Sequence, residues 1–171
     1  HLRRTGARRL LDLGCGNGWL AARMARALGA RVTAVDVSGA ELALAAEAFD
    51  GVEGLDLVLA DVFEDVLPRG DFDAVVVASA AQYFPDLPRL VRRLFELLAP
   101  GGEVLLLDGP LWRSRMEAEA AAERSRAHYA GVGTPGLAGA FHHHRRSLLE
   151  PFAPRWYYLP ERAESRLARR L

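Results

Sequence analysis

Short apolar runs alternate with segments of helical spacing over about the first hundred residues, and this alternation limits the fold more than any other feature. Runs such as "FDAVVVA" are typical of strands in a sheet that helices cover on both faces. We expect strands at Arg9–Leu13, Arg31–Val35, Asp56–Ala60, Phe72–Ala78 and Glu103–Leu107, and helices at Trp19–Leu28, Ala40–Phe49 and Leu87–Leu98. The alternation predicts right-handed crossovers between parallel strands. The fold class is therefore α/β, a doubly wound and mostly parallel sheet in three αβα layers.

Two helix boundaries carry their own signals. Ser38 stands where an N-cap would open the second helix, and Glu41 follows three residues later, as in a capping box. Pro100 and the two glycines after it form a stop signal between the third helix and the next strand.

The pattern changes after Asp108, and we expect one domain over residues 1–171 with a core in 1–108 and a second part in 109–171. The segment "WRSRMEAEAAAERSRAHYA" is rich in alanine, glutamate and arginine, which indicates a helix with a solvated face. The later segments are expected to be a mobile loop at Gly131–Phe141, a short helix at His142–Phe152, a late strand at Pro154–Pro160 and a basic helix at Glu161–Leu171.

Charge, hydropathy and cysteine content narrow the possible partners of the chain and the cellular compartment in which we expect it. The 171 residues carry 22 basic and 22 acidic side chains, so the charge balance gives no support for a nucleic-acid or acidic-membrane partner. No apolar run reaches the length of a membrane span. The single cysteine, Cys15, excludes an internal disulfide and fits a reducing compartment. With no secretory signal pattern, we expect a cytoplasmic protein.

Three glycines follow the first expected strand within five positions, and they indicate a place where a ligand approaches the backbone closely. In an open parallel sheet, ligands bind beyond the carboxyl ends of the strands. Three strand exits present an aspartate: Asp36, Asp61 and Asp108. The two oxygens of Asp36, about twenty residues past the loop, suit the paired hydroxyls of a ribose. Asp61 could accept from an adenine amino group, so a nucleoside-containing ligand is expected.

The glycine spacing alone leaves the ligand open. A dinucleotide fingerprint is G-x-G-x-x-G, whereas this loop reads Gly14-Cys15-Gly16-Asn17-Gly18-Trp19, with Trp19 where the third glycine would stand. A glycine pattern by itself is a weak signal.

Five motifs in register are more specific. "LLDLGCGNGWLAARMA" resembles the first motif of class I S-adenosylmethionine-dependent methyltransferases. "VTAVDVS", "LVLADVFE", "FDAVVVASAAQYFPDL" and "LFELLAPGGEVLLLD" resemble the second to fifth motifs, in the same order and spacing over about residues 9–108. The resemblance is to the broad group of these enzymes that acts on small molecules, and it implies a Rossmann-like methyltransferase domain with S-adenosylmethionine as cofactor.

The resemblance also implies roles by position. Asp12 would orient the loop and contact the methionine amino group, directly or through water. Asp36 would hold the ribose, with Val37 against the adenine. Asp61 would bind the adenine amino group, with Val62 packed nearby. The remaining positions implied to line the cofactor are Gly14, Cys15, Gly16 and Gly18 in the loop, and Ala78, Ser79 and Gln82 after the fourth strand.

The acceptor side is less defined. The segment after the fourth strand lacks the prolines of DNA amino-methyltransferases and the cysteine of cytosine C5 enzymes, so a small-molecule acceptor is favoured. Three adjacent histidines cannot all point one way, which argues against a metal site at "HHHRR". An oxygen or nitrogen acceptor can need a general base. The sequence does not select one among Tyr83, His128, His142, His143 and His144.

Two other functions stay open at this point. One is a nicotinamide-dependent oxidoreductase, against which Trp19 and the Leu-Ala-Pro-Gly-Gly turn argue. The other is a module that binds S-adenosylmethionine without catalysis, as a regulatory subunit, because no base is evident. The oligomeric state is not assigned.

Overall fold

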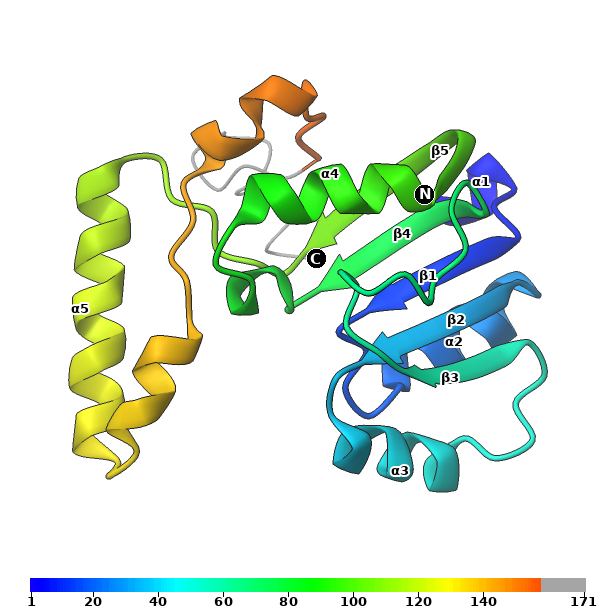
Figure 1. Cartoon of the computed structure of the whole chain (residues 1–171), viewed down its shortest axis with the longest axis horizontal. Helices are drawn as coiled ribbons and strands as arrows, with labels where there is room; N and C mark the ends of the chain where they lie inside the picture. Colours follow the sequence, from blue (N-terminus) through cyan, green and yellow to red (C-terminus); the bar gives the residue numbers. More distant parts are fainter. Residues whose placement is uncertain (158–171) are drawn as a thin grey trace, which may run out of the picture.

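A computed structural model describes residues 1–157 and shows one parallel sheet of five strands in the order β3-β2-β1-β4-β5 (Figure 1). The strands are β1 (Arg9–Leu13), β2 (Arg31–Asp36), β3 (Leu55–Leu59), β4 (Phe72–Ala78) and β5 (Leu98–Leu107). The chain starts in the middle of the sheet, moves outward to β3, and then returns to the other side of β1. The strand order therefore reverses between β1 and β4, where open α/β sheets bind their ligands. The α/β, doubly wound fold class is confirmed.

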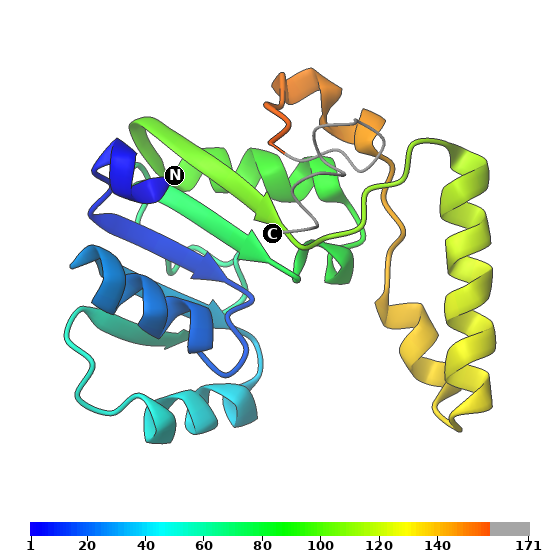
Figure 2. The same cartoon turned by 180° about the vertical axis from the view of Figure 1, so that it is seen from behind.

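Helices cover both faces of the sheet, as Figures 1 and 2 show. Successive residues of β1 point to opposite faces, with Leu11 in the apolar cluster that contains α4 (Leu87–Leu97) and Leu10 in the cluster that contains α2 (Trp19–Leu28). The helix α3 (Gly39–Ala48) contacts β2 and β3 near the edge of the sheet, and the short α1 (Leu2–Thr5) precedes β1. Three αβα layers result.

Local signals explain where the helices begin. Ser38 caps α3 and accepts a hydrogen bond from the Glu41 backbone N–H at 3.3 Å, as the capping box predicts. Asp86 caps α4 in the same way, accepting from the Arg89 N–H at 2.8 Å.

The start expected for the fifth strand is wrong by five residues, since β5 begins at Leu98 and not at Glu103. Leu98 pairs with Phe72 while Glu103 pairs with Ala74, so the Pro-Gly-Gly turn bulges out between two paired positions. A bulge keeps both ends of the strand in the sheet, which the sequence pattern did not indicate.

The crossover from β3 to β4 is a loop, residues 60–71, and a buried arginine of α4 holds it. Arg93 is only 7% exposed and donates to the carbonyl oxygens of Val62 and Glu64 at 2.8 and 3.0 Å. Its third partner is the Glu96 carboxylate at 3.0 Å. Val62 and Leu67 of the loop are buried against α4, so the loop covers this face of the sheet without forming a helix.

The second part of the chain begins with a hairpin that stands apart from the sheet (Figures 1 and 2). It consists of α5 (Arg115–Gly131) and the 3-10 helix η2 (Pro135–Ala140), which contact each other. Ser114 caps α5 and accepts from the Glu117 N–H at 3.1 Å. An extended segment, residues 141–145, leads back to the core; we call it the arm. Another 3-10 helix, η3 (Arg146–Phe152), then packs against α4, with the Phe152 ring 5.9 Å from that of Phe95.

Three expectations for this part need correction. The helix expected from His142 begins only at Arg146, because the arm forms backbone hydrogen bonds with other segments instead of with itself. The expected loop at Gly131–Phe141 contains the end of α5 and η2. Residues 154–157 form no strand, the rest of the expected late strand lies outside the described residues, and so does the expected helix Glu161–Leu171.

Among the described residues, no helix combines the length and the apolar character that crossing a membrane requires.

We expect Arg93→Ala to lower the free energy of unfolding by about 2–3 kcal/mol, because it leaves the loop carbonyls without their charged donor. Arg92 lies on the exposed side of the same helix, so Arg92→Ala is the matched control and should change stability by less than about 0.5 kcal/mol. Urea unfolding of the three proteins measures the difference. Equal midpoints for both variants would contradict the role of Arg93.

Candidate functional site

The glycine loop between β1 and α2 requires glycine for its backbone shape. Gly14, Gly16 and Gly18 have φ values of 70°, 52° and 74°, in the left-handed region that side chains disfavour. The N–H groups of Gly14 and Cys15 both donate to the Val35 carbonyl, at 2.8 and 3.1 Å. The loop is therefore fastened to the carboxyl end of β2.

Two of these glycines also have no space for a side chain. A Cβ at Gly14 would lie 2.5 Å from the Cβ of Ala80, just beyond β4, and a Cβ at Gly18 would lie 2.9 Å from the Cβ of Ala45 in α3. At Gly16 the nearest atom would be a Glu41 oxygen at 3.9 Å, so that side of the loop is open. The loop thus packs against two elements and leaves its middle glycine accessible.

Asp12 lies at the carboxyl end of β1, directly before the loop. Its side chain is 1% exposed, and one carboxylate oxygen, Oδ2, is buried without a hydrogen-bond partner. Burial is the main cause that raises its pKa to about 7; a backbone hydrogen bond from Ala21 acts against this rise, and the charge of Asp36 adds to it. A buried acceptor without a partner is unfavourable by itself, so Oδ2 is an acceptor that the described part of the chain leaves open.

The environment of Cys15 favours the protonated thiol. Burial raises the pKa of its thiol to about 12, and the charges of Asp12 and Asp36 act in the same direction. The reactive form of cysteine is the thiolate, which is therefore scarce at neutral pH. The role of Cys15 in the loop is that of a small, half-buried residue.

Asp36 at the end of β2 is oriented by backbone groups on both sides. Its oxygens accept from the Gly16 N–H at 2.8 Å and from the Ser38 N–H at 2.9 Å. A carboxylate has about four acceptor sites, so two remain for a ligand. Val37 follows with 72% of its surface exposed, which presents an apolar face beside the carboxylate.

Asp61 stands two residues beyond β3, at the same edge of the sheet. Its side chain is exposed, and Oδ1 accepts from the Phe63 N–H at 2.9 Å in a local turn. Val62, by contrast, is 2% exposed and belongs to the core.

The residues that follow β4 lie on the other side of the glycine loop from β2. Ala78 ends the strand, and Ser79 has a left-handed backbone with φ 52°. The Gln82 amide, in the short 3-10 helix η1 (Ala81–Tyr83), donates to the Ser79 carbonyl at 2.6 Å, while its Oε1 is buried without a partner. All twelve positions expected from the sequence thus lie on the loop or at the carboxyl ends of β1 to β4.

The arm joins this edge of the sheet to the hairpin. The His142 N–H donates to the Gln82 carbonyl at 2.7 Å, and the Trp112 N–H donates to the His144 carbonyl at 2.9 Å. His144 is 6% exposed, with Nε2 2.9 Å from the Phe84 carbonyl. Aromatic rings line the approach, since Phe141 lies 5.1 Å from Tyr83 and 5.4 Å from Tyr129.

Sequence reasoning missed two contributors. Ala80 faces the glycine loop, and only its place just after the fourth strand could have pointed to it. Ser114 and Glu117 match the Ser-x-x-Glu pattern, and the N-cap bond from the Glu117 N–H to Ser114 would have placed the start of α5 correctly.

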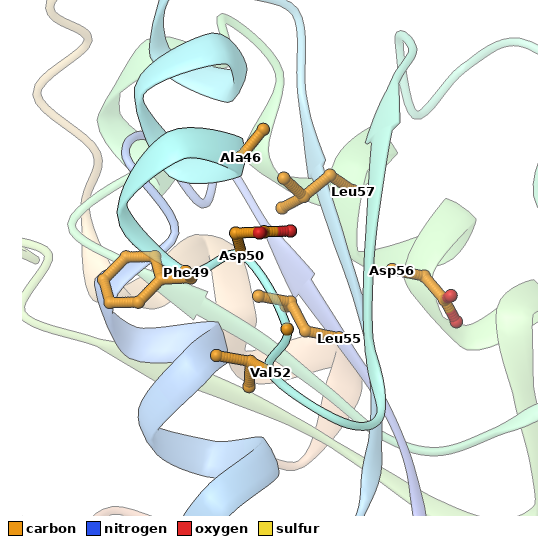
Figure 3. Close-up of a pocket in the computed structure, with 8 residues that line it drawn as sticks. Ala46, Phe49, Asp50, Val52, Leu55, Asp56 and Leu57 are labelled. Atoms are coloured by element: carbon orange, nitrogen blue, oxygen red, sulfur yellow. The ribbon is translucent and has the colours of Figure 1, made fainter.

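A hollow of about 350 Å³ elsewhere does not belong to this site (Figure 3). It lies between the end of α3 and the beginning of β3, and Phe49, Val52, Leu55 and Leu57 are its apolar lining. In Figure 3 the Asp56 side chain points away from it. The hollow is at the amino end of β3, opposite the edge that carries the glycine loop. Within residues 1–157, no group of three or more histidine, cysteine, aspartate or glutamate side chains could hold a metal ion.

Curated relatives of this chain are named as methyltransferases. 27-O-demethylrifamycin SV methyltransferase of Amycolatopsis mediterranei is 36% identical over 127 residues, which are 72% of this chain and 47% of that protein. The chain spans about half the length of the first curated relatives that it matches.

Solved structures that are more than 30% identical to this chain include a methyltransferase and a cyclase. An S-adenosylmethionine-dependent methyltransferase from Mesorhizobium loti is 36% identical, with a TM-score of 0.52 over 59% of this chain and 45% of its own. The [4+2]-cyclase SpnF is 32% identical, with a TM-score of 0.53 over 58% of this chain and 38% of its own.

The family described as "Methyltransferase domain" matches residues 10–102, more than half of the chain. The chain therefore belongs to the methyltransferase domain family, in agreement with the resemblance of its five motifs to class I S-adenosylmethionine-dependent methyltransferases.

Proposed function

We propose that the chain binds S-adenosylmethionine at the carboxyl edge of its sheet and transfers the methyl group to a small-molecule acceptor. The observation that carries the proposal is the joint presence of the left-handed glycine loop and the buried, unpartnered Asp12 oxygen, in a chain of the methyltransferase domain family. We also propose that residues 1–171 form one domain, with the cofactor-binding core in 1–108, and that the protein is cytoplasmic.

The residues present fit the cofactor. The open side of Gly16 lets a ligand approach the backbone, and Asp36 keeps two acceptor sites for the ribose hydroxyls. Val37 offers an exposed apolar surface for the adenine, and Asp61 an exposed carboxylate for its amino group. The Asp12 oxygen is left for the amino group of the methionine part. Gly14, Cys15, Gly18 and Val62 support these contacts, and Ala78, Ser79 and Gln82 line the side where transfer takes place.

The bound cofactor supplies an already electrophilic methyl group. The protein therefore acts mainly by positioning an acceptor in line with that group and by excluding water. The segment from Ser79 to Gln82 borders the acceptor on one side, and the arm with Tyr83 and Phe141 borders it on the other. We infer that the acceptor lies between them.

A function without methyl transfer is the second candidate, because the likeness to a [4+2]-cyclase links this sequence pattern to other chemistry. Binding of S-adenosylhomocysteine without methyl transfer to any tested acceptor would favour it. The oxidoreductase alternative gains no support from the relatives.

We expect S-adenosylhomocysteine to bind in isothermal titration with micromolar affinity, and NAD(H) not to bind. Asp36→Ala should weaken binding by about 10- to 100-fold, because it removes hydrogen bonds to a charged acceptor. Asp56→Ala is the matched control: it removes a carboxylate that pairs with Arg31 at the far end of β3, and it should leave the affinity unchanged. A folded wild-type protein that does not bind S-adenosylhomocysteine would contradict the proposal.

We expect that binding of S-adenosylhomocysteine releases a proton from Asp12. In the free protein its pKa is about 7, so most molecules are protonated at pH 6. The cationic amino group of the ligand favours the carboxylate, so affinity should rise about tenfold from pH 6 to pH 8 and level off above that. Titration in two buffers of different ionisation enthalpy measures the proton directly. Asp12→Asn should abolish this pH dependence, and equal wild-type affinity at pH 6 and pH 8 would refute the role of Asp12.

A further inference from the structure

We propose that Trp112, Arg124 and His143 form a binding site for a carboxylate group between α5 and the arm. The site lies on the opposite side of the arm from the stacked rings of His142 and His144. It goes beyond the proposed function, because a ligand can occupy it whether or not the chain transfers a methyl group.

The backbone of the arm places His143 beside Trp112. Trp112 and Arg145 form a parallel β-bridge, and the Trp112 N–H donates to the His144 carbonyl at 2.9 Å. Paired residues of such a bridge carry their side chains on the same side, and so do residues two positions apart in an extended segment. His143, two positions before Arg145, therefore shares the side of Trp112, and the two rings lie 6.3 Å apart.

Three buried ring nitrogens at this place have no hydrogen-bond partner within residues 1–157. They are Nε1 of Trp112 and both Nδ1 and Nε2 of His143. The indole nitrogen can only donate, and a neutral imidazole donates through one of its two nitrogens. Buried donors without partners are unfavourable, so the protein alone leaves these two rings unsatisfied. A group with two acceptor oxygens between the rings can accept from both.

Arg124 adds a positive charge to these donors. Its guanidinium lies over the Trp112 ring, 5.7 Å from the ring centroid, and it forms no ion pair with any residue that the structure describes. Glu117 lies two turns earlier on α5, and its carboxylate accepts from the Arg113 N–H at 2.9 Å. The guanidinium is therefore a cation beside two unsatisfied donors, which favours an anionic ligand.

The charges around His143 indicate which anion fits. Burial lowers the pKa of His143, and nearby positive charges lower it further; these belong to Arg124, Arg126 and His142. Arg126 forms an ion pair with Glu123, whereas Arg124 has no such partner in the described chain. A single unbalanced charge matches a carboxylate better than a phosphate monoester, which carries about −1.5 to −2 at neutral pH.

The position of α5 lets a ligand enter. Figures 1 and 2 show the arm running beside α5, which contacts η2 and hardly touches the strands of the sheet. The arm itself is held to the core by its backbone hydrogen bonds. A small shift of α5 away from the arm therefore exposes the three ring nitrogens without disturbing the glycine loop.

NMR of the indole N–H groups tests the site, with benzoate as the probe. The chain has three tryptophans, so three indole signals are expected, and Trp112→Phe identifies the signal of Trp112. Benzoate should shift this signal to a saturating value. Benzamide has nearly the same shape without the charge and should not shift it. Phenyl phosphate should bind more weakly than benzoate.

Substitutions then separate the charge from the ring contacts. Arg124→Gln should weaken benzoate binding by at least about tenfold, because it removes the cation. His143→Phe keeps an aromatic ring without its donor and should also weaken binding. Arg115→Gln is the matched control, since Arg115 pairs with Glu119 on the same helix, and it should leave the affinity unchanged. The other two indole signals report whether each variant is folded.

Two kinds of result would overturn the proposal. No shift of the Trp112 signal with benzoate, an equal shift with benzamide, or unchanged affinity in Arg124→Gln would exclude the site. Tighter binding of phenyl phosphate than of benzoate would exclude the choice of carboxylate.

S-adenosylhomocysteine binding, measured on the same proteins, distinguishes this site from the proposed function. Wild type and Arg124→Gln should bind S-adenosylhomocysteine equally. If neither binds it while benzoate still shifts the Trp112 signal of the wild type, the proposed function fails and the carboxylate site stands.

Discussion

The close approach of Gly14 to Ala80 is the contact on which the site depends. It joins the loop after β1 to the segment after β4 at the point where strand order reverses, with no room for even one methyl group between them. The same loop is tied to the end of β2 through the Val35 carbonyl and to Asp36 through the Gly16 N–H. Three strand exits therefore meet around one backbone, which gives a ligand polar groups from each of them.

A second constraint acts from the other side of the sheet. The return from β3 to β4 is made by a loop, whose buried carbonyls need donors that no helix supplies. Arg93 of α4 provides them from within the core, and Phe63 of the loop lies under the Arg89 side chain at 4.3 Å. The position of Asp61, directly before this loop, thus depends on α4 as well as on β3.

The hairpin of α5 and η2 contributes through the arm. Because the arm forms hydrogen bonds with η1 and with Trp112 beside the end of β5, its direction is set by the core, whereas the hairpin beyond it contacts the sheet little. The core therefore determines where the hairpin begins and ends, although the hairpin itself packs little on the sheet.

The sequence alone predicted the parallel α/β sheet and the edge of that sheet at which the twelve expected positions lie. It could do so because the alternation of strand and helix segments, the glycines at turns and the aspartates directly after strands are patterns that short stretches of chain determine by themselves. The same local reasoning placed β1 and the cap of α3 correctly. It failed for the start of β5 and for the arm, most of which was expected to be helical, and it made no prediction for the crossover held by Arg93. Each failure involves hydrogen bonds between residues far apart in the chain, such as Leu98 beside Phe72 or His142 on Gln82. Such hydrogen bonds form only when the sheet has formed, so only the tertiary structure decided where β5 begins and which path the arm takes.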